Sequence, residues 1–268
     1  MTDNRVHRAK VRTRPIPIFS STQVDVDLRS PHRIVDASQV PVYINNRDRV
    51  STVKTTVDWL LSAGTQRIVI LDNDSTYPPL LDYYKTLPFG VSVHYYGANL
   101  GPWAFWDVKK FHLRQDMPYV FTDSDMVPDE GCPKDLIHRL NVLLNEHPES
   151  GKVGSGLKIA DIPDLYSMNG CDHNEQVQYW KSRYSPEAFF AAIDTTFALY
   201  PAYSNGRVDT LLPDGTYIQF SHDNLNNLRM DNPYVWKHAP WYAVPPLSEE
   251  ELYYRTHCNK EWSHSIGL

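Results

Sequence analysis

The sequence contains few cysteines and no long hydrophobic run. The three cysteines, Cys132, Cys171 and Cys258, are far apart and form no CxxC pair, so neither a disulfide framework nor a structural zinc site is indicated. No stretch approaches the roughly 18 uninterrupted apolar residues of a membrane span, and the first residues lack the apolar core of a signal peptide. These absences predict a soluble protein of the reducing cytoplasm without an integral membrane segment.

Glycine-rich phosphate-binding loops are also missing. The first apolar run, residues 40–44, leads into a turn at 45–49 that contains no glycine. A Rossmann dehydrogenase would carry G-x-G-x-x-G at this turn, and a sugar-phosphate nucleotidyltransferase would also carry a glycine-rich loop there. No P-loop pattern occurs elsewhere. These three nucleotide-binding classes are therefore disfavoured.

An overall excess of positive charge is absent as well. The formal net charge is -6 and the pI is about 6.0, which argues against a protein that holds nucleic acid chiefly through phosphate contacts. Basic residues do gather near the start, where five Lys and Arg lie between positions 5 and 14. We interpret residues 1–37 as a basic arm, either a solvated tail or a segment that meets an anionic membrane surface, an anionic acceptor or the protein's own acidic face.

What the sequence does contain is a regular alternation of apolar runs and helical stretches. Strands are predicted near 40–44, 67–71, 91–95 and 118–122, with helices between them. This alternation predicts an α/β fold with a doubly wound, mostly parallel sheet and helices on both faces. Further elements are expected as a helix at 133–147, a strand at 152–159, a helix at 173–183, a hairpin near 205–215 and a closing helix at 248–255.

Polar residues follow the predicted strands within a few positions. They are Arg47, Asp72, Asn99, Asp123 and Asp125. Because ligands of such sheets bind beyond the carboxyl ends of the strands, these side chains are expected at one edge. Asp123 and Asp125 share a face of an extended chain, and two close carboxylates favour a hard divalent cation that also contacts phosphate. Taken alone, Asp-x-Asp is a weak signal, because it is more often a solvated turn after a strand.

Together these features resemble the nucleotide-sugar glycosyltransferases of the GT-A fold, and within them the inverting family 2. The resemblance covers about residues 38–245, as one domain over 38–268 with a nucleotide-binding half at 38–126 and an acceptor-binding half at 127–268. It is carried by Asn45-Asn46-Arg47, Asp72-Asn73-Asp74, Asn99-Leu100-Gly101, Thr122-Asp123-Ser124-Asp125, Ile193-Asp194-Thr195-Thr196 and His238-Ala239-Pro240-Trp241.

The resemblance implies a nucleotide site and a metal site. The nucleotide would be bound by Asn45, Arg47, Asp72, Asn99 and Asp123, and the metal would be held by Asp123, Asp125 and His238. An imidazole ligand among oxygen ligands suits Mn²⁺ better than Mg²⁺. The alternative for His238 is an ordinary surface or core histidine.

The resemblance also implies a general base that takes the proton of the acceptor hydroxyl. Asp194, an isolated carboxylate between two apolar runs, is the candidate. The family often has a Glu-Asp pair here, where this chain has Ile193 and Asp194, and a structural role for Asp194 stays open. Weaker candidates for the base are Asp161, Asp164 and Asp172.

Aromatic residues are abundant, at 12% of the chain, and some of them could bind sugar rings. An acceptor platform is predicted at Trp180, Trp241 and Tyr242, together with Tyr184, and core packing accounts equally well for each. The expected activity is metal-dependent, inverting transfer of a sugar from a nucleoside diphosphate donor, UDP being favoured, to a hydroxyl of a glycan or lipid-linked glycan. The alternatives are transfer to hydroxymethylated pyrimidines in DNA and a non-catalytic nucleotide-sugar-binding module.

Overall fold

The computed structural model describes most of the predicted domain. The described residues are 35–107, 116–148, 150–164, 179–193, 196–202, 209–211, 217–219 and 227–257. The predictions for the first 34 residues of the basic arm, for Asp172 and for Asp194 lie outside these ranges. A short 3₁₀ helix, η1 (Ala37–Gln39), precedes the first strand.

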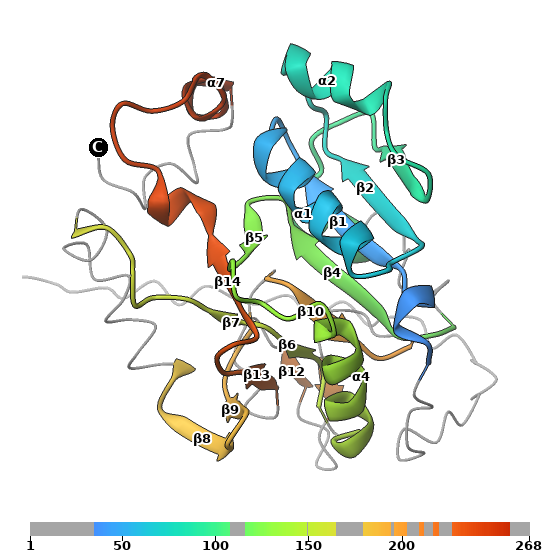
Figure 1. Ribbon diagram of the computed structural model, residues 1–268. Helices are drawn as coiled ribbons and strands as arrows, with labels where there is room; N and C mark the ends of the chain where they lie inside the picture. The colour runs from blue at the N-terminus through green and yellow to red at the C-terminus, as the bar shows by residue number, and fades with distance from the viewer. Residues whose placement is uncertain are drawn as a thin grey trace, which may run out of the picture.

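The first half of the domain builds four parallel strands in the order β3-β2-β1-β4 (Figure 1). Their bounds are β1 (Val42–Asn46), β2 (Ile68–Asp72), β3 (Val91–Tyr95) and β4 (Tyr119–Asp123), and the helices between them are α1 (Ser51–Ser62), α2 (Pro78–Tyr84) and α3 (Ala104–Asp107). Each strand lies within two residues of its predicted position. The alternation of strand and helix is confirmed.

The second half extends this sheet with mixed strand directions. The full order is β3-β2-β1-β4-β10-β6-β13-β9-β8, and β10 is antiparallel to both of its neighbours. The added strands are β6 (Val153–Gly154), β8 (Ser182–Ser185), β9 (Ala188–Phe190), β10 (Ala198–Tyr200) and β13 (Leu228–Met230). Because β8 occupies 182–185, the helix predicted to run to 183 is wrong at its C-terminal end. The expected hairpin forms between β11 (Asp209–Leu211) and β12 (Tyr217–Gln219).

The strand predicted at 152–159 is divided between two sheets. After β6 the chain enters β7 (Gly156–Leu157), which joins a three-stranded sheet ordered β5-β14-β7 with β5 (Met126–Pro128) and β14 (Val235–His238). Glycine allows the chain to pass from one sheet to the other. A Cβ on Gly154 would lie 2.9 Å from the carbonyl oxygen of Phe197, and one on Gly156 would lie 2.8 Å from the indole of Trp180.

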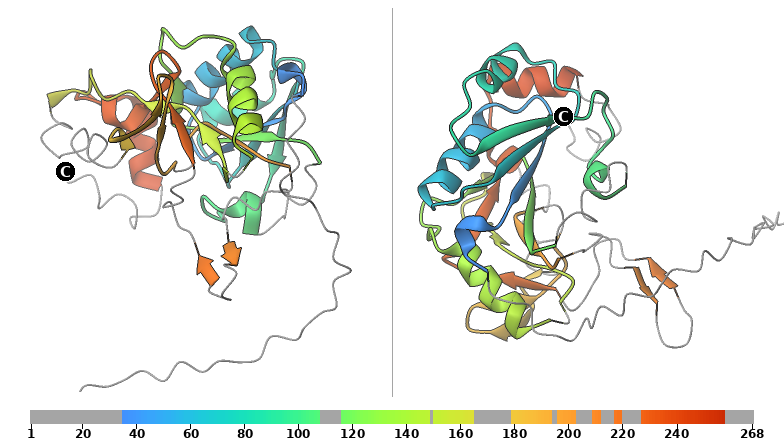
Figure 2. Two further views of the ribbon diagram at one scale, coloured as in Figure 1. Left: turned by 90° about the horizontal axis from the view of Figure 1, so that it is seen from below. Right: turned by 90° about the vertical axis from the view of Figure 1, so that its right-hand side faces the viewer.

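Helices cover both faces of the large sheet (Figure 2). On one face, α1, α2 and α4 (Leu136–Glu146) pack their apolar side chains onto the sheet. On the other face, α3 supplies an aromatic layer in which Trp106 lies 4.3 Å from Phe121, between ring centroids, and donates a hydrogen bond to the Tyr119 hydroxyl at 3.0 Å. The predicted fold class, an α/β Rossmann-like sheet with helices on both faces, is confirmed.

The N-terminus of α1 is completed from the far end of the chain. Ser51 is the first residue of α1, and the preceding Val50 makes no side-chain capping bond. The amide and hydroxyl of Ser51 each donate a 2.9 Å hydrogen bond to the carboxylate of Glu250 in α7 (Glu249–His257). After the helix, Gly64 has a φ of 85° and its amide donates a hydrogen bond to the carbonyl of Leu61, as a C-terminal glycine does.

The chain closes through a 3₁₀ helix, η3 (Ala239–Tyr242), and then α7. The Ser248 hydroxyl accepts a 3.1 Å hydrogen bond from the amide of Glu251, which is one half of a capping box. Within the described ranges, none of the helices has the length and apolar character needed to cross a membrane.

Candidate functional site

The carboxyl edge of the parallel strands gathers several predicted site residues. Strand pairing places Asn46 beside Asp72 and Asn45 beside Asp123. Asp125 follows two residues after the end of β4, in the turn into β5. Since all these strands run in one direction, the backbone positions of the five residues lie along one edge of the sheet.

Asp72 is buried, and its carboxylate is held by neutral partners. Its Oδ2 accepts a 2.9 Å hydrogen bond from the Tyr84 hydroxyl, and its Oδ1 accepts a 3.1 Å bond from the amide of Ser75. The side-chain amide of Asn46 donates to the same Tyr84 hydroxyl at 2.9 Å. Burial and the nearby Asp72 raise the pKa of Tyr84 well above its usual value, so the phenol stays a donor. Each carboxylate oxygen still has lone-pair capacity for a ligand.

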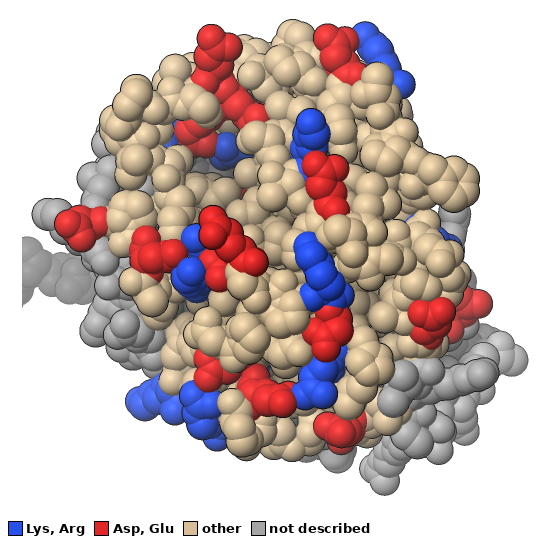
Figure 3. Space-filling model, in the orientation of Figure 1, with Lys and Arg blue, Asp and Glu red and all other residues tan. Residues whose placement is uncertain are grey.

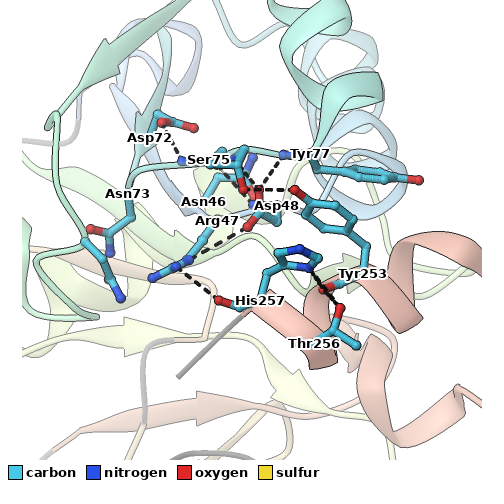
Figure 4. A network of polar contacts seen from close by, with 12 residues as sticks. Asn46, Arg47, Asp48, Asp72, Asn73, Ser75, Tyr77, Tyr253, Thr256 and His257 are labelled. Atoms are coloured by element: carbon cyan, nitrogen blue, oxygen red, sulfur yellow. Dashed lines mark hydrogen bonds and ion pairs between the residues drawn. The ribbon is translucent and has the colours of Figure 1, made fainter. Parts of the chain in front are cut away.

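Asp48 joins the loop after β1 to the loop after β2 (Figure 4). Its side chain is buried, and Oδ1 accepts hydrogen bonds from the amides of Thr76 at 2.6 Å and Tyr77 at 2.8 Å. The amide of Asp48 donates to the Ser75 hydroxyl at 3.0 Å, and its φ of 52° turns the chain sharply. Asp48 is not among the predicted site residues. It fixes the position of its neighbour Arg47.

Arg47 lies over the same edge and is lightly held. Its Nη2 is 3.4 Å from the carbonyl oxygen of His257, and its Nε is 3.8 Å from Oδ2 of Asp48. Figure 4 shows the guanidinium extending from the loop toward the side of Asn73. Both contacts are long for hydrogen bonds, so the cation can turn to an anionic ligand at little cost.

Asn73 anchors the loop that carries Asn99. The Asn73 side chain donates to the carbonyl of Gly101 at 2.9 Å and accepts from the amide of Leu100 at 2.7 Å. Asn99 itself is exposed, and its side-chain oxygen accepts from the amide of Gly101 at 3.2 Å. The structure therefore brings Asn99 to the loop beside β2, with its amide group turned partly to solvent.

Asp125 and His238 are in contact. His238 Nε2 lies 3.4 Å from Asp125 Oδ2, and both side chains remain partly accessible, at 29% and 23%. The contact follows from strand pairing, because β14 is antiparallel to β5 and places His238 opposite Met126. The amide of Ala239 also donates to the carbonyl oxygen of Asp125 at 2.8 Å.

The charge environment keeps Asp125 ionised. Burial raises the pKa of Asp125, but its electrostatic interaction and hydrogen bond with His238 and the charge of Arg49 outweigh this and hold it below the usual value of a carboxyl group. An ionised carboxylate oxygen and an imidazole nitrogen side by side fit a divalent ion such as Mn²⁺, with the other coordination positions left to a ligand. The donor chemistry of the pair therefore fits the predicted cofactor.

Asp123 does not complete a three-residue cluster with this pair. Within the described part of the chain, no three His, Cys, Asp or Glu side chains are grouped closely enough to hold a metal ion. Asp123 is the last residue of β4 and lies at the edge where β1 ends. This position fits both of its predicted roles, at the nucleotide and at the metal. The assignment of all three residues as metal ligands stays a prediction.

A cavity of about 130 Å³ lies beside His238. Two of its lining residues, Ala192 and Thr196, lie on either side of Asp194 in the sequence, so the cavity borders the segment that carries the predicted base. It is lined by Leu157, Tyr179, Ala192, Thr196, Arg229, His238 and Trp241.

Only one residue of the predicted aromatic platform lines this cavity. Trp241 does so, with its ring edge-on to His238 at 4.9 Å between centroids. Trp180 instead packs against Phe189 at 5.1 Å. The Tyr184 hydroxyl lies 2.6 Å from a ring nitrogen of His147 and takes no part in the cavity lining.

Tyr242 and Asp161 belong to a charged network on the three-stranded sheet. The Tyr242 hydroxyl donates to Asp161 Oδ1 at 2.9 Å, and Asp161 Oδ2 lies 3.1 Å from both Lys158 Nζ and Lys237 Nζ. Asp129 pairs with the same two lysines at 2.7 and 3.4 Å. With these partners, Asp161 is placed to hold the sheet together, and its assignment as a weaker candidate for the base stays a prediction.

Four lining residues were not predicted to belong to a site, namely Arg229, Tyr179, Thr196 and Leu157. Arg229 offered a signal, because it interrupts the apolar run Leu228-Arg229-Met230 just as Asp194 interrupts its own surroundings. The sequence around the other three residues carries no such signal. They reach the cavity because of the way the two sheets pack together.

Comparisons with known proteins give little beyond this geometry. No protein-family model matches the chain, and no curated protein matches it in sequence. Among solved structures, the chain is similar to a crystal structure of GalNAc-T7 with UDP, GalNAc and Mn²⁺, with 10% identity and a TM-score of 0.45 over 74% of this chain. The chain spans 43% of the length of that structure. At such low similarity, a functional assignment has to come from the residues of this chain.

Proposed function

We propose that this protein is a metal-dependent glycosyltransferase that moves a sugar from a nucleoside diphosphate donor, with UDP favoured, to a hydroxyl acceptor. The observation that carries the proposal is the contact between Asp125 and His238, which lies between the strand edge of Asp72 and the cavity at Trp241. The nucleoside end and the sugar end of a donor need different environments, and the strand edge and the cavity provide one for each.

The nucleoside would lie at the ends of β1 and β2. Asp72 is a fixed hydrogen-bond acceptor there, suited to the N–H and hydroxyl groups of a base and ribose. Arg47 is held only by two long contacts and would meet the negative charge of the nucleotide. Asn45, Asn99 and Asp123 are the further residues that we place at the nucleotide.

Asp125 and His238 would hold the Mn²⁺, or Mg²⁺, at the diphosphate. When bound, such an ion neutralises the negative charge that develops on the leaving nucleoside diphosphate. Asp125 would supply a carboxylate oxygen and His238 an imidazole nitrogen to this ion, and phosphate oxygens would supply further ligands.

Transfer also needs a base on the acceptor side. As the acceptor oxygen bonds to the anomeric carbon, the bond to the diphosphate breaks and the hydroxyl proton has to leave. Asp194, next in sequence to the cavity-lining segment, is the residue we propose to take that proton. Direct displacement of this kind inverts the anomeric configuration. A glycan or lipid-linked glycan is the proposed acceptor.

The alternative acceptor, hydroxymethylated DNA, gains no support from the surface in Figure 3. On that face, Lys and Arg side chains alternate with Asp and Glu, and the described basic residues form no continuous band. A duplex-binding surface would need such a band to neutralise phosphates. A non-catalytic binding module would show nucleotide binding without turnover.

The first experiment is thermal unfolding with UDP, GDP, dTDP and CDP, each with and without Mn²⁺. We expect one nucleotide to stabilise the protein in a Mn²⁺-dependent manner, by about 2.7 kcal/mol at a hundredfold excess over Kd. Asp125→Asn should abolish the Mn²⁺-dependent part, since it removes the anionic ligand. Asp82→Asn, which removes an exposed carboxylate on α2, is the matched control and should respond as the wild type does. Absence of any nucleotide-dependent shift would contradict the proposal.

A further inference from the structure

A buried arginine lies near Asp125, in the loop that follows β1. This residue, Arg49, comes two positions before the start of α1, and Asp125 comes one position before β5. The two elements are in contact, because the Thr56 hydroxyl of α1 donates a 2.8 Å hydrogen bond to the carbonyl of Met126 in β5. Arg49 and Asp125 are therefore close enough to interact electrostatically. Among the described residues, however, Arg49 forms no ion pair with Asp125.

Arg49 is held instead by α7. Its Nη1 donates a hydrogen bond to Oε2 of Glu251, and both side chains are only 8% exposed. The guanidinium carbon of Arg49 also lies 3.8 Å from the ring centroid of Tyr254, one helical turn after Glu251. Glu251 is fixed in turn, because Arg255 Nε donates to its other carboxylate oxygen at 2.7 Å. Two residues of α7 thus determine where the guanidinium lies.

An arginine that paired with Asp125 would compete with a metal ion for the same oxygens. A guanidinium binds a carboxylate through two parallel hydrogen bonds, which occupy lone pairs that a metal ion would need. Arg49 has a donor to spare for such a pair, since its buried Nε has no hydrogen-bond partner in the described part of the protein. The ion pair with Glu251 therefore keeps a competitor away from the proposed metal ligand.

We propose that Glu251 is a positioning residue for the metal site, because it holds Arg49 on α7 and so leaves the Asp125 carboxylate to Mn²⁺. The inference rests on the proposed function and adds to it a residue that is distant from Asp125 in the sequence. Glu251 acts through Arg49 and is not itself a ligand of the ion.

The test measures the affinity for Mn²⁺ itself, by calorimetric titration of Mn²⁺ into the full chain with excess UDP, corrected by a titration into UDP alone. In Glu251→Gln the partner of Arg49 loses its charge, and the guanidinium turns to Asp125. We expect the Kd for Mn²⁺ to rise by at least about tenfold, as it does when a residue that orients metal ligands is replaced. Arg49→Gln should bind Mn²⁺ at least as tightly as the wild type, because it removes a positive charge near the ion.

The double variant Arg49→Gln/Glu251→Gln separates a positioning role from a purely structural one. It has no guanidinium to compete for Asp125, so its affinity for Mn²⁺ should return close to that of Arg49→Gln. If Glu251 served only to pack α7, the double variant would bind Mn²⁺ as poorly as Glu251→Gln, and the inference would be wrong.

Two further variants keep the test decisive. Tyr254→Leu removes the ring beside the guanidinium without changing a charge, and it should weaken Mn²⁺ binding by a smaller factor even if Glu251→Gln fails to fold. Glu249→Gln is the matched control, because it removes one negative charge from an exposed position of the same helix. It should bind Mn²⁺ as the wild type does.

The remaining outcomes separate this inference from the proposed function. Unchanged Mn²⁺ affinity in Glu251→Gln, with Mn²⁺-dependent UDP binding in the wild type, would overturn the positioning role alone. If Arg49→Gln weakens UDP binding in the absence of Mn²⁺, Arg49 serves the nucleotide and the positioning role is also overturned. If the wild type shows no Mn²⁺-dependent binding of a nucleotide, the proposed function is wrong.

Discussion

Asp72 and Asp125 lie at the same edge of the sheet, but their partners differ in kind. Asp72 is held by a phenol and a backbone amide, which are neutral and fixed. Asp125 is held by an imidazole at 3.4 Å, a contact that is long for a hydrogen bond and leaves both groups partly accessible. Neutral, rigid partners suit recognition of a nucleoside, whereas a loosely paired carboxylate and imidazole can both turn to a metal ion.

Also at the scale of single residues, Asp194→Asn should separate nucleotide binding from sugar transfer. An amide cannot take the acceptor proton, so we expect turnover of the nucleotide sugar to fall by a factor of about 10²–10⁴. Mn²⁺-dependent nucleotide binding should be retained. Release of nucleoside diphosphate and calorimetric titration measure the two properties in the same preparation.

The control for this prediction is Asp164→Asn, because Asp164 is an exposed member of the weaker candidates for the base. It should turn over as the wild type does. Undiminished turnover in Asp194→Asn would remove Asp194 as the base, and a loss confined to Asp164→Asn would transfer that role to Asp164.

At the scale of single elements, the three-stranded sheet depends on charge. Asp129, after β5, and Asp161, after β7, share two lysines, one of them on β14. Burial raises the pKa of each carboxyl group, but the hydrogen bonds and charges of Lys158 and Lys237 outweigh this and lower both pKa values below 3.8. The network holds in register the strand that ends in His238.

This network predicts how acid affects stability. A carboxyl group whose pKa is lower in the folded state adds stability above about pH 4, and that stability is lost as pH falls through the folded pKa. Asp129→Asn should therefore lower the free energy of unfolding at pH 7 by about 1 kcal/mol and have a smaller effect at pH 3. Urea unfolding at several pH values measures both.

The matched control is Asp82→Asn, which breaks an ion pair with Lys85 in which both side chains are 73% exposed. Exposed substitutions of this kind change stability by less than about 0.5 kcal/mol. If Asp129→Asn lost as much stability at pH 3 as at pH 7, the carboxylate charge would not be the cause.

The elements also show how far sequence reasoning reaches. The four parallel strands were predictable, because buried strands are apolar on both faces and end in polar residues such as Asp72 and Asp123. The division of 152–159 was not, since it depends on backbone approaching Gly154 and Gly156 from distant segments. Arg229 was missed as a site residue for the same reason: its neighbours at the cavity come from four other parts of the chain.

At the scale of the whole molecule, α7 connects the end of the described chain to the start of α1. Glu250 accepts two hydrogen bonds from Ser51 at the start of α1, and its neighbour Glu251 pairs with the buried Arg49. Tyr253 adds a ring contact with Tyr77, at 4.7 Å between centroids. The Glu250 carboxylate thus accepts the hydrogen bonds that an N-cap side chain would accept, although it lies 199 residues away in the sequence.

Glu250→Ala should therefore destabilise the whole fold, by about 1–2 kcal/mol, as the loss of an N-cap does. Glu250→Gln keeps one acceptor oxygen and should lose less. Glu249→Ala, on the exposed neighbour, is the control and should stay close to the wild type. Chemical denaturation gives the three values, and equal losses in Glu249→Ala and Glu250→Ala would contradict a capping role.

The contacts between α7 and the start of α1 have a consequence for folding during synthesis on the ribosome. The strands and helices of residues 42–95 emerge early, but the first turn of α1 and the buried guanidinium of Arg49 have to wait for their partners at 250 and 251. Contacts of such long sequence separation form late and slow the folding reaction. Residues 42–95 therefore reach their final structure only after residue 251 has been made, because until then the carboxylate partners of Ser51 and Arg49 are missing.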